Sequence, residues 1–231
     1  MSFDFSLIAD SIPKMLMGLG LTLNLMLVTA VLGTALAIGL LLMRLSGKWY
    51  LQWPALAYIY VFRGTPILVQ IFIIYYGLPQ FEWVRESIFW SILREPYGCA
   101  VLALTLNTGA YVSEILRGGV LGVDRGLLEA ASALGLSIRQ RFIYITSPIA
   151  IRLATPAYSN DIVSLMKSTA LASTITLLDM MGIARTIVAE TFAPYEVFIS
   201  LAIIYMILTL FIQKGFGMFE RYMSRHIKKE T

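Results

Sequence analysis

Charged residues are scarce in this chain of 231 residues. They form 14% of the sequence, against roughly 25% in a typical soluble domain, and hydrophobic residues form 58%. This composition excludes an ordinary soluble domain and predicts an all-α integral membrane protein with several spans. We interpret the net charge of +4 as a signal of membrane topology and not as a nucleic-acid-binding surface.

Cysteine and histidine are almost absent. Cys99 is the only cysteine, so no disulfide can form within the chain, and His226 is the only histidine. One histidine in a basic tail offers neither a metal-ligand cluster nor a base for a nucleophile. The chain also lacks the glycine-rich P-loop motif that cradles nucleotide phosphates. We therefore expect neither a membrane-embedded enzyme nor ATP hydrolysis by this chain itself.

Apolar segments are abundant, and five of them are long enough to cross a bilayer, which takes about 20 residues. We expect these five transmembrane helices at 15–43, 54–78, 97–116, 156–178 and 195–212, within a single domain of residues 1–231. An ion-coupled secondary transporter is a rival class, but the absence of an evident internal repeat argues against it.

The basic residues between these segments are unevenly divided. Four would lie on one side of the membrane: Lys14, Arg85, Arg94 and Arg185. Twelve would lie on the other: Arg44, Lys48, Arg117, Arg125, Arg139, Arg141, Arg152, Lys214, Arg221, Arg225, Lys228 and Lys229. Because loops rich in Lys and Arg stay in the cytoplasm, the sequence predicts an external N-terminus and a cytoplasmic C-terminus.

The longest polar interruption is the loop 118–148, between the third and fourth segments. Leu127–Leu134 is rich in Ala, Leu and Glu and should form a short helix, which Gly135 can end in the left-handed conformation. A second helical piece, Ile138–Ile145, would follow at an angle. By the charge count this elbow is cytoplasmic and offers a rigid ridge to a partner; a plain amphipathic connector is the alternative.

Four ionisable residues remain at membrane depth: Arg63, Glu114, Asp161 and Lys167. Each costs roughly 2.5 to 3.5 kcal/mol near the centre of a bilayer, so each should face a partner or a cavity. Glu114 precedes Arg117 by three residues, which favours a structural ion pair on one helix. Lys167 points to a different face from Asp161, and its partner is left open.

Asp161 is the sharpest candidate for a binding residue. Ser164 and Ser168 follow it at i+3 and i+7, which makes one polar stripe on an apolar helix. A carboxylate beside hydroxyls in a low-dielectric cavity binds a cation well. We therefore take Asp161, Ser164 and the preceding Ser159 as candidate substrate ligands. The alternative is that Asp161 pairs with Arg63 or Lys167 and only locks helices.

The second apolar segment contains a break at Arg63-Gly64-Thr65-Pro66. Pro66 removes a backbone donor, so nearby carbonyl groups are freed where a cavity could use them. Broken helices commonly line the substrate path of transporters, and Arg63 joins the candidate substrate-binding residues on this ground. The alternative is that the break is only a packing kink, with Arg63 reaching to the cytoplasmic interface.

Several motifs together resemble the polar amino acid permeases of the ABC importers. They are Phe62-Arg63-Gly64-Thr65-Pro66 with Val69-Gln70, Asn107 with Ala110-Tyr111 and Ser113-Glu114, Glu129-Ala130-Ala131 with Gly135, Ile145 and Pro148, and Tyr158-Ser159-Asn160-Asp161 with Lys167-Ser168-Thr169. The likeness covers most of residues 15 to 215 and is greatest to the histidine/lysine/arginine/ornithine type. One departure is Ser147, where the family usually has Leu.

The resemblance implies a subunit of a bacterial inner-membrane importer whose external side is the periplasm. It implies that Glu129, Ala130, Ala131 and Gly135 lie on a coupling helix that docks on a pair of ATP-binding subunits, which hold the ATP and Mg. A second permease subunit, identical or homologous, and a periplasmic binding protein are the other implied partners, and this chain itself would hold no cofactor.

The substrate implied is a basic amino acid or an opine derivative; a neutral or acidic polar amino acid, with Asp161 purely structural, is the alternative. The sequence leaves open which basic compound is carried. It also leaves open whether Arg63 and Lys167 contact the substrate or Asp161.

The predicted topology can be checked by labelling cysteines in intact cells. A cysteine placed at Gln80 should react with a membrane-impermeant reagent added from outside, because it follows the second span, whereas one at Ser137 should react only after the cells are opened. External labelling at Ser137 would invert the topology.

Overall fold

The computed structural model describes residues 5–223, all of whose regular elements are helical. Arg225, His226, Lys228 and Lys229, which entered the sequence argument, lie outside the described residues.

Three helices are long and apolar enough to cross a membrane: α2 (Leu19–Leu45), α7 (Pro96–Leu121) and α12 (Pro194–Met223). Two bent pairs could each supply a further span. In the first, α3 (Trp49–Gly64) meets the helical stretch from α4 (Ile67–Phe72) to Gln80 at 104°. In the second, α10 (Ser147–Ser168), with its flanking turns, meets α11 (Met180–Thr191) at 50°. The described residues, 5–223, thus contain three clear spans and at most five.

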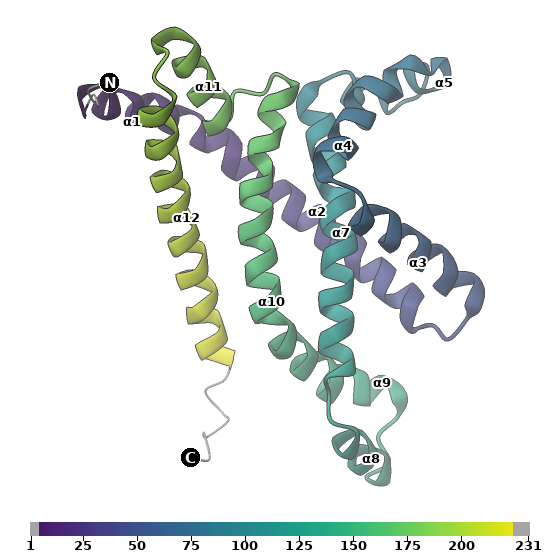
Figure 1. Cartoon of the computed structure of the whole chain (residues 1–231). Helices are drawn as coiled ribbons and strands as arrows, with labels where there is room; N and C mark the ends of the chain where they lie inside the picture. The colour runs from purple at the N-terminus through teal and green to yellow at the C-terminus, as the bar shows by residue number, and fades with distance from the viewer. Residues whose placement is uncertain (1–4, 224–231) are drawn as a thin grey trace.

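The third segment, now α7, packs against both α2 and α10. In Figure 1, α2 crosses behind α7 and α10 runs beside it. Glycines allow these close approaches. A Cβ on Gly33 of α2 would lie 2.8 Å from a methyl carbon of Thr108, and one on Gly119 would lie 2.4 Å from the carbonyl oxygen of Ala150. Such small residues let membrane helices pack closely where side chains would hold them apart.

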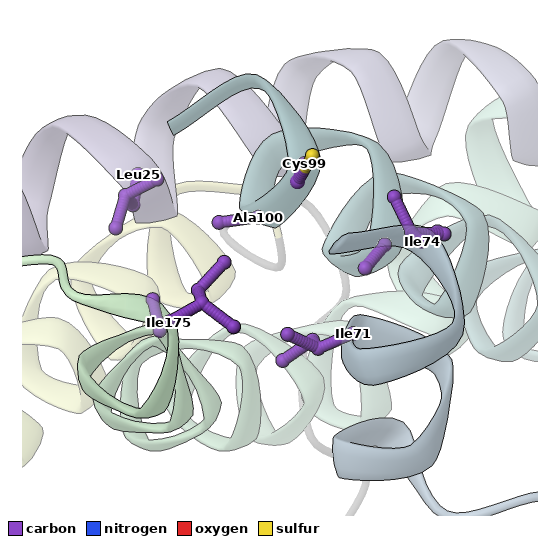
Figure 2. Packing of buried hydrophobic residues seen from close by; sticks show 8 residues of the cluster. Leu25, Ile71, Ile74, Cys99, Ala100 and Ile175 are labelled. Atoms are coloured by element: carbon purple, nitrogen blue, oxygen red, sulfur yellow. The ribbon is translucent and has the colours of Figure 1, made fainter. Parts of the chain in front are cut away.

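One buried cluster joins four parts of the chain, as Figure 2 shows. Leu25 of α2, Ala100 of α7 and Ile71 of α4 converge on Ile175, the last residue of a 3₁₀ segment, Thr169–Ile175, that follows α10. The lone cysteine, Cys99, belongs to this cluster and is fully buried. The cluster therefore fixes the bent α4 segment against the ends of α2, α7 and α10.

Helix ends depart from the expected spans in three places. The first segment is divided, because α1 (Phe5–Met17) ends at Gly18, which packs against the backbone of Asp179 and leaves no room for a side chain. The fourth begins at Ser147 and continues through Pro156 instead of starting there. The fifth runs beyond Lys214 to Met223, since a charge that ends an apolar run does not end a helix.

Short elements lie outside the long helices. α5 (Glu82–Arg85) and α6 (Trp90–Leu93) connect the bent segment to α7. They lie near the end of the molecule that also holds α1 and α11, whereas α8 (Arg125–Ala133), α9 (Ile138–Arg141) and the last turn of α12 lie at the opposite end (Figure 1).

The elbow between α7 and α10 has well-defined helix caps. The Asp124 side chain accepts the backbone N–H groups that begin α8. At its end Gly135 has a φ of +78°, and the N–H of Leu136 donates to the carbonyl of Ala131 at 3.1 Å, which is the Schellman arrangement. Ser137 and Gln140 then form a reciprocal capping box for α9. The predicted second piece, Ile138–Ile145, is therefore not a separate helix. α9 ends at Arg141, and a π-helical turn, Phe142–Thr146, leads from it directly into α10.

A substitution at Gly135 should act only through strain of its left-handed backbone conformation. No other atom lies within 4 Å of a Cβ built there, so Gly135→Leu strains the left-handed conformation by about 1 kcal/mol without a clash inside the chain. If the elbow docks on an ATPase, as its resemblance implies, reconstituted vesicles should hold the inserted mutant but show uptake poorly coupled to ATP hydrolysis.

Gly118→Leu is the matched control, because Gly118 is also uncrowded but has no left-handed backbone. Normal ATP-driven uptake by Gly135→Leu would remove the coupling role of this turn.

Candidate functional site

The bend between α3 and α4 is held by side chains that replace lost backbone hydrogen bonds. Pro66 has no N–H to donate to the carbonyl of Phe62, four residues earlier. That carbonyl instead accepts from Gln70 Nε2 at 2.9 Å and from Asn107 Nδ2 at 3.1 Å. Gln70 is 6% exposed, and its Oε1 accepts a further bond from Asn107 at 3.1 Å. These bonds tie the bend to α7.

A cavity of about 410 Å³ opens beside this bend. Its volume is within the range of roughly 300 to 1,000 Å³ that small-molecule sites occupy. The bend contributes Arg63, Gly64, Thr65, Pro66 and Ile67; α7 contributes Leu104, Asn107, Thr108 and Tyr111; and α10 contributes Asp161, Ser164, Leu165 and Ser168.

Three of the four candidate substrate ligands therefore line one cavity. Asp161, Ser164 and Arg63 are brought together from α10 and the end of α3. Ser159 is not among them: it is 8% exposed and lies two residues before Asp161, which is about 200° around the helix. The stripe of i, i+3 and i+7 residues defined the face correctly, and Ser159 lies on another.

Asp161 has no counter-ion among the described residues. Within residues 5–223 no ion pair joins it to Arg63 or to Lys167. The guanidinium of Arg63 instead lies over the ring of Tyr111, with Cζ 5.2 Å from the ring centroid. Lys167 lines a separate groove between α10 and α12 with Tyr205 and Thr209. The alternative, in which Asp161 only locks helices together by pairing with Arg63 or Lys167, is thus not the arrangement found.

Glu114 has the structural role that its spacing indicated. Arg117 Nε and Nη2 donate to both of its carboxylate oxygens at 2.9 to 3.1 Å. Arg44, at the end of α2, adds a bond from Nη1 to Oε1 at 3.0 Å. The ion pair on α7 is confirmed, and the link to α2 is a contact over 70 residues that the sequence did not indicate.

Four site residues were missed by sequence reasoning as ligands or supports: Gln70, Asn107, Tyr111 and Arg44. Gln70 and Asn107 carried a usable signal, because a polar amide inside an apolar segment must find a partner and Pro66 had freed a carbonyl nearby. Tyr111 and Arg44 carried none, since each acts through a residue on another helix.

Comparison with known proteins gives consistent results. A family model described as binding-protein-dependent transport system inner membrane component matches residues 31–225. The chain is 47% identical to an octopine transport system permease protein of Rhizobium radiobacter, over 95% of the chain and 90% of that protein. It is 39% identical to a histidine/lysine/arginine/ornithine transport system permease protein of Escherichia coli K12, over 93% of the chain and 90% of that protein.

A solved structure of an amino acid ABC transporter with histidines is also similar. It is 33% identical to this chain, and the two superpose with a TM-score of 0.85 over 96% of the chain and all of the solved one.

The support of the bend can be tested by removing one amide. Asn107→Leu leaves Gln70 Oε1 without its donor and weakens the capture of the Phe62 carbonyl, at a cost of about 1 to 3 kcal/mol. We expect the unfolding temperature of the purified protein to fall by about 5 °C. Asn160→Leu, the same change at an exposed site of α10, should have little effect. Equal unfolding temperatures for the two variants would contradict the supporting role of Asn107.

Proposed function

The chain belongs to the family of binding-protein-dependent transport system inner membrane components, and from that premise we propose that it carries a basic amino acid or an opine derivative across the bacterial inner membrane. It is the permease subunit of an ABC importer for amino acids or opines, a multi-pass transport protein and not an enzyme. What remains to be argued is which chemical class of substrate its cavity selects.

The observation that carries the proposal is the unpaired carboxylate of Asp161 in a cavity shared with Arg63. A substrate ammonium or guanidinium group satisfies that carboxylate by a charge-assisted hydrogen bond, with the Ser164 hydroxyl alongside as a second acceptor. The Arg63 guanidinium suits the substrate carboxylate, which its planar fork can bind through two parallel bonds. A basic amino acid carries both groups and completes both ends of the cavity.

We further propose that the elbow is the coupling surface for a pair of ATP-binding subunits, which bind and hydrolyse the ATP. Glu129 and Ala130 are exposed on α8, whereas Ala131 is 2% exposed and anchors it. Leu134 and Ile138, on either side of Gly135, are 81% and 78% exposed. Apolar side chains so exposed outside the lipid favour a partner that covers them. A second permease subunit and a periplasmic binding protein complete the proposed assembly.

The charge of Asp161 provides the test of the substrate class. Asp161→Asn keeps the size of the side chain but leaves a substrate cation without a counter-ion, at a cost of about 3 to 5 kcal/mol, on the order of a hundredfold or more in transport. We expect ATP-driven uptake of arginine to fall by that factor, while any uptake of citrulline, its neutral analogue, is unchanged or improved. Uptake is measured in reconstituted vesicles and normalised to assembled complex.

Glu190→Gln, which removes an exposed carboxylate of α11, serves as the control and should transport arginine normally. A structural role for Asp161 gives a different result, because uptake of every substrate would then fall together with the amount of assembled complex. A fully assembled Asp161→Asn complex that moves arginine at the unaltered rate would end the proposal.

A further inference from the structure

A second cavity, of about 460 Å³, adjoins the Asp161 cavity. The two have three residues in common: Arg63, Gly64 and Tyr111. Tyr111 holds Arg63 on two sides, because its ring lies under the guanidinium and its hydroxyl lies 3.5 Å from the carbonyl oxygen of Arg63. Arg63 and Tyr111 therefore form a partition between the two cavities.

The two cavities follow one face of α7 in sequence. Asn107 lines the first cavity, Tyr111 lines both, and Glu114 and Arg117 line the second. These residues are spaced by four, three and three positions, which keeps them on one side of the helix. α7 runs from the α4 and α5 end of the molecule towards the elbow (Figure 1). The second cavity thus lies between the Asp161 cavity and the elbow end.

The second cavity has an excess of positive charge. Three arginines line it, Arg44, Arg63 and Arg117, with Glu114 as their only acidic companion. Glu114 is held by Arg44 and Arg117, and Arg63 has no ion pair within the described chain from 5 to 223. Each guanidinium has five N–H donors, and the bonds to Glu114 use one nitrogen of Arg44 and two of Arg117. Donors therefore remain for an anionic ligand.

We propose that this second cavity is a carboxylate-binding vestibule on the substrate route, entered from the Asp161 cavity past Arg63 and Tyr111. The identification of the ligand as the substrate's own carboxylate rests on the proposed function. The attraction of the cavity for anions rests on the three arginines alone. A basic amino acid has one carboxylate, which Arg63 can bind at the partition. An opine such as octopine has a second, and Arg44 and Arg117 are the groups across the partition that can receive it.

The anion preference can be measured without any substrate. Leu56→Cys places a thiol on the wall of the second cavity, and Cys99→Ala removes the buried native cysteine. In the detergent-purified complex at low salt, each reagent's rate is divided by its rate with free cysteine; so normalised, a sulfonate-bearing methanethiosulfonate should modify this thiol about tenfold faster than its trimethylammonium counterpart. Adding Arg44→Gln should lower that ratio about threefold or more, and Glu114→Gln should raise it.

Two control variants keep the result specific to the cavity. Lys48→Gln removes an exposed cation that follows Arg44 by four residues, in the loop between α2 and α3 and outside the cavity, and should leave the ratio unchanged. Arg44→Lys keeps the charge and should largely restore it. A ratio near one in the protein without these charge changes, or equal effects of Arg44→Gln and Lys48→Gln, would overturn the vestibule.

Binding of octopine and arginine to the same complex tests the identity of the anion. Arg44→Gln should weaken octopine about fivefold relative to arginine, whereas Lys48→Gln should weaken neither. An unchanged octopine-to-arginine ratio would overturn the assignment of the second carboxylate to this cavity. If neither octopine nor arginine binds, the proposed substrate class fails, and the labelling ratio still decides whether the anion site exists.

Discussion

The arrangement of the proposed substrate cavity depends on the carbonyl group of Phe62. A backbone acceptor at membrane depth cannot be left to water, so the bond that Pro66 removes must be replaced within the protein. Gln70 and Asn107 replace it, and in doing so they fix a bend of 104° against α7. The bend places Arg63, Thr65 and Pro66 together on the wall of the cavity that Asp161 lines from α10.

The same rule, that a charge in the membrane needs a partner, has opposite meanings at the two acids of the bundle. Both carboxylate oxygens of Glu114 are paired with arginines, one on its own helix and one on α2. This arrangement is typical of a structural ion pair that links two helices. Asp161 instead lines a cavity and has no cation paired with it in the described chain, residues 5–223. This contrast in pairing, more than the presence of either carboxylate, separates the proposed binding residue, Asp161, from the structural residue, Glu114.

Local periodicity and backbone chemistry could be predicted from the sequence, and long-range contacts could not. The common face of Asp161 and Ser164, the pairing of Glu114 with Arg117 and the helix end at Gly135 each depend on residues a few positions apart. Arg44 joins Glu114 across 70 residues, and no local spacing encodes that. Ser159, predicted as a substrate ligand, does not line the cavity, because it is close to Asp161 in sequence but lies on another face of the helix. The extension of α12 past Lys214 was missed because hydropathy marks the membrane boundary and not the helix boundary.

Arg63 and Asp161 are both under-compensated by the chain itself, and in ways that suit a bipolar ligand. Arg63 lies in the last turn of α3, where the negative end of the helix dipole favours a cation, and the face of Tyr111 adds a weak attraction. These partners hold the guanidinium in place without occupying its donors as a carboxylate would. Asp161 lacks even such weak compensation from a cation. A ligand with one positive and one negative group can therefore pair with both side chains at once, whereas an uncharged ligand would leave both charges unmatched. The proposed selection for charged amino acids thus follows from what the fold leaves unpaired.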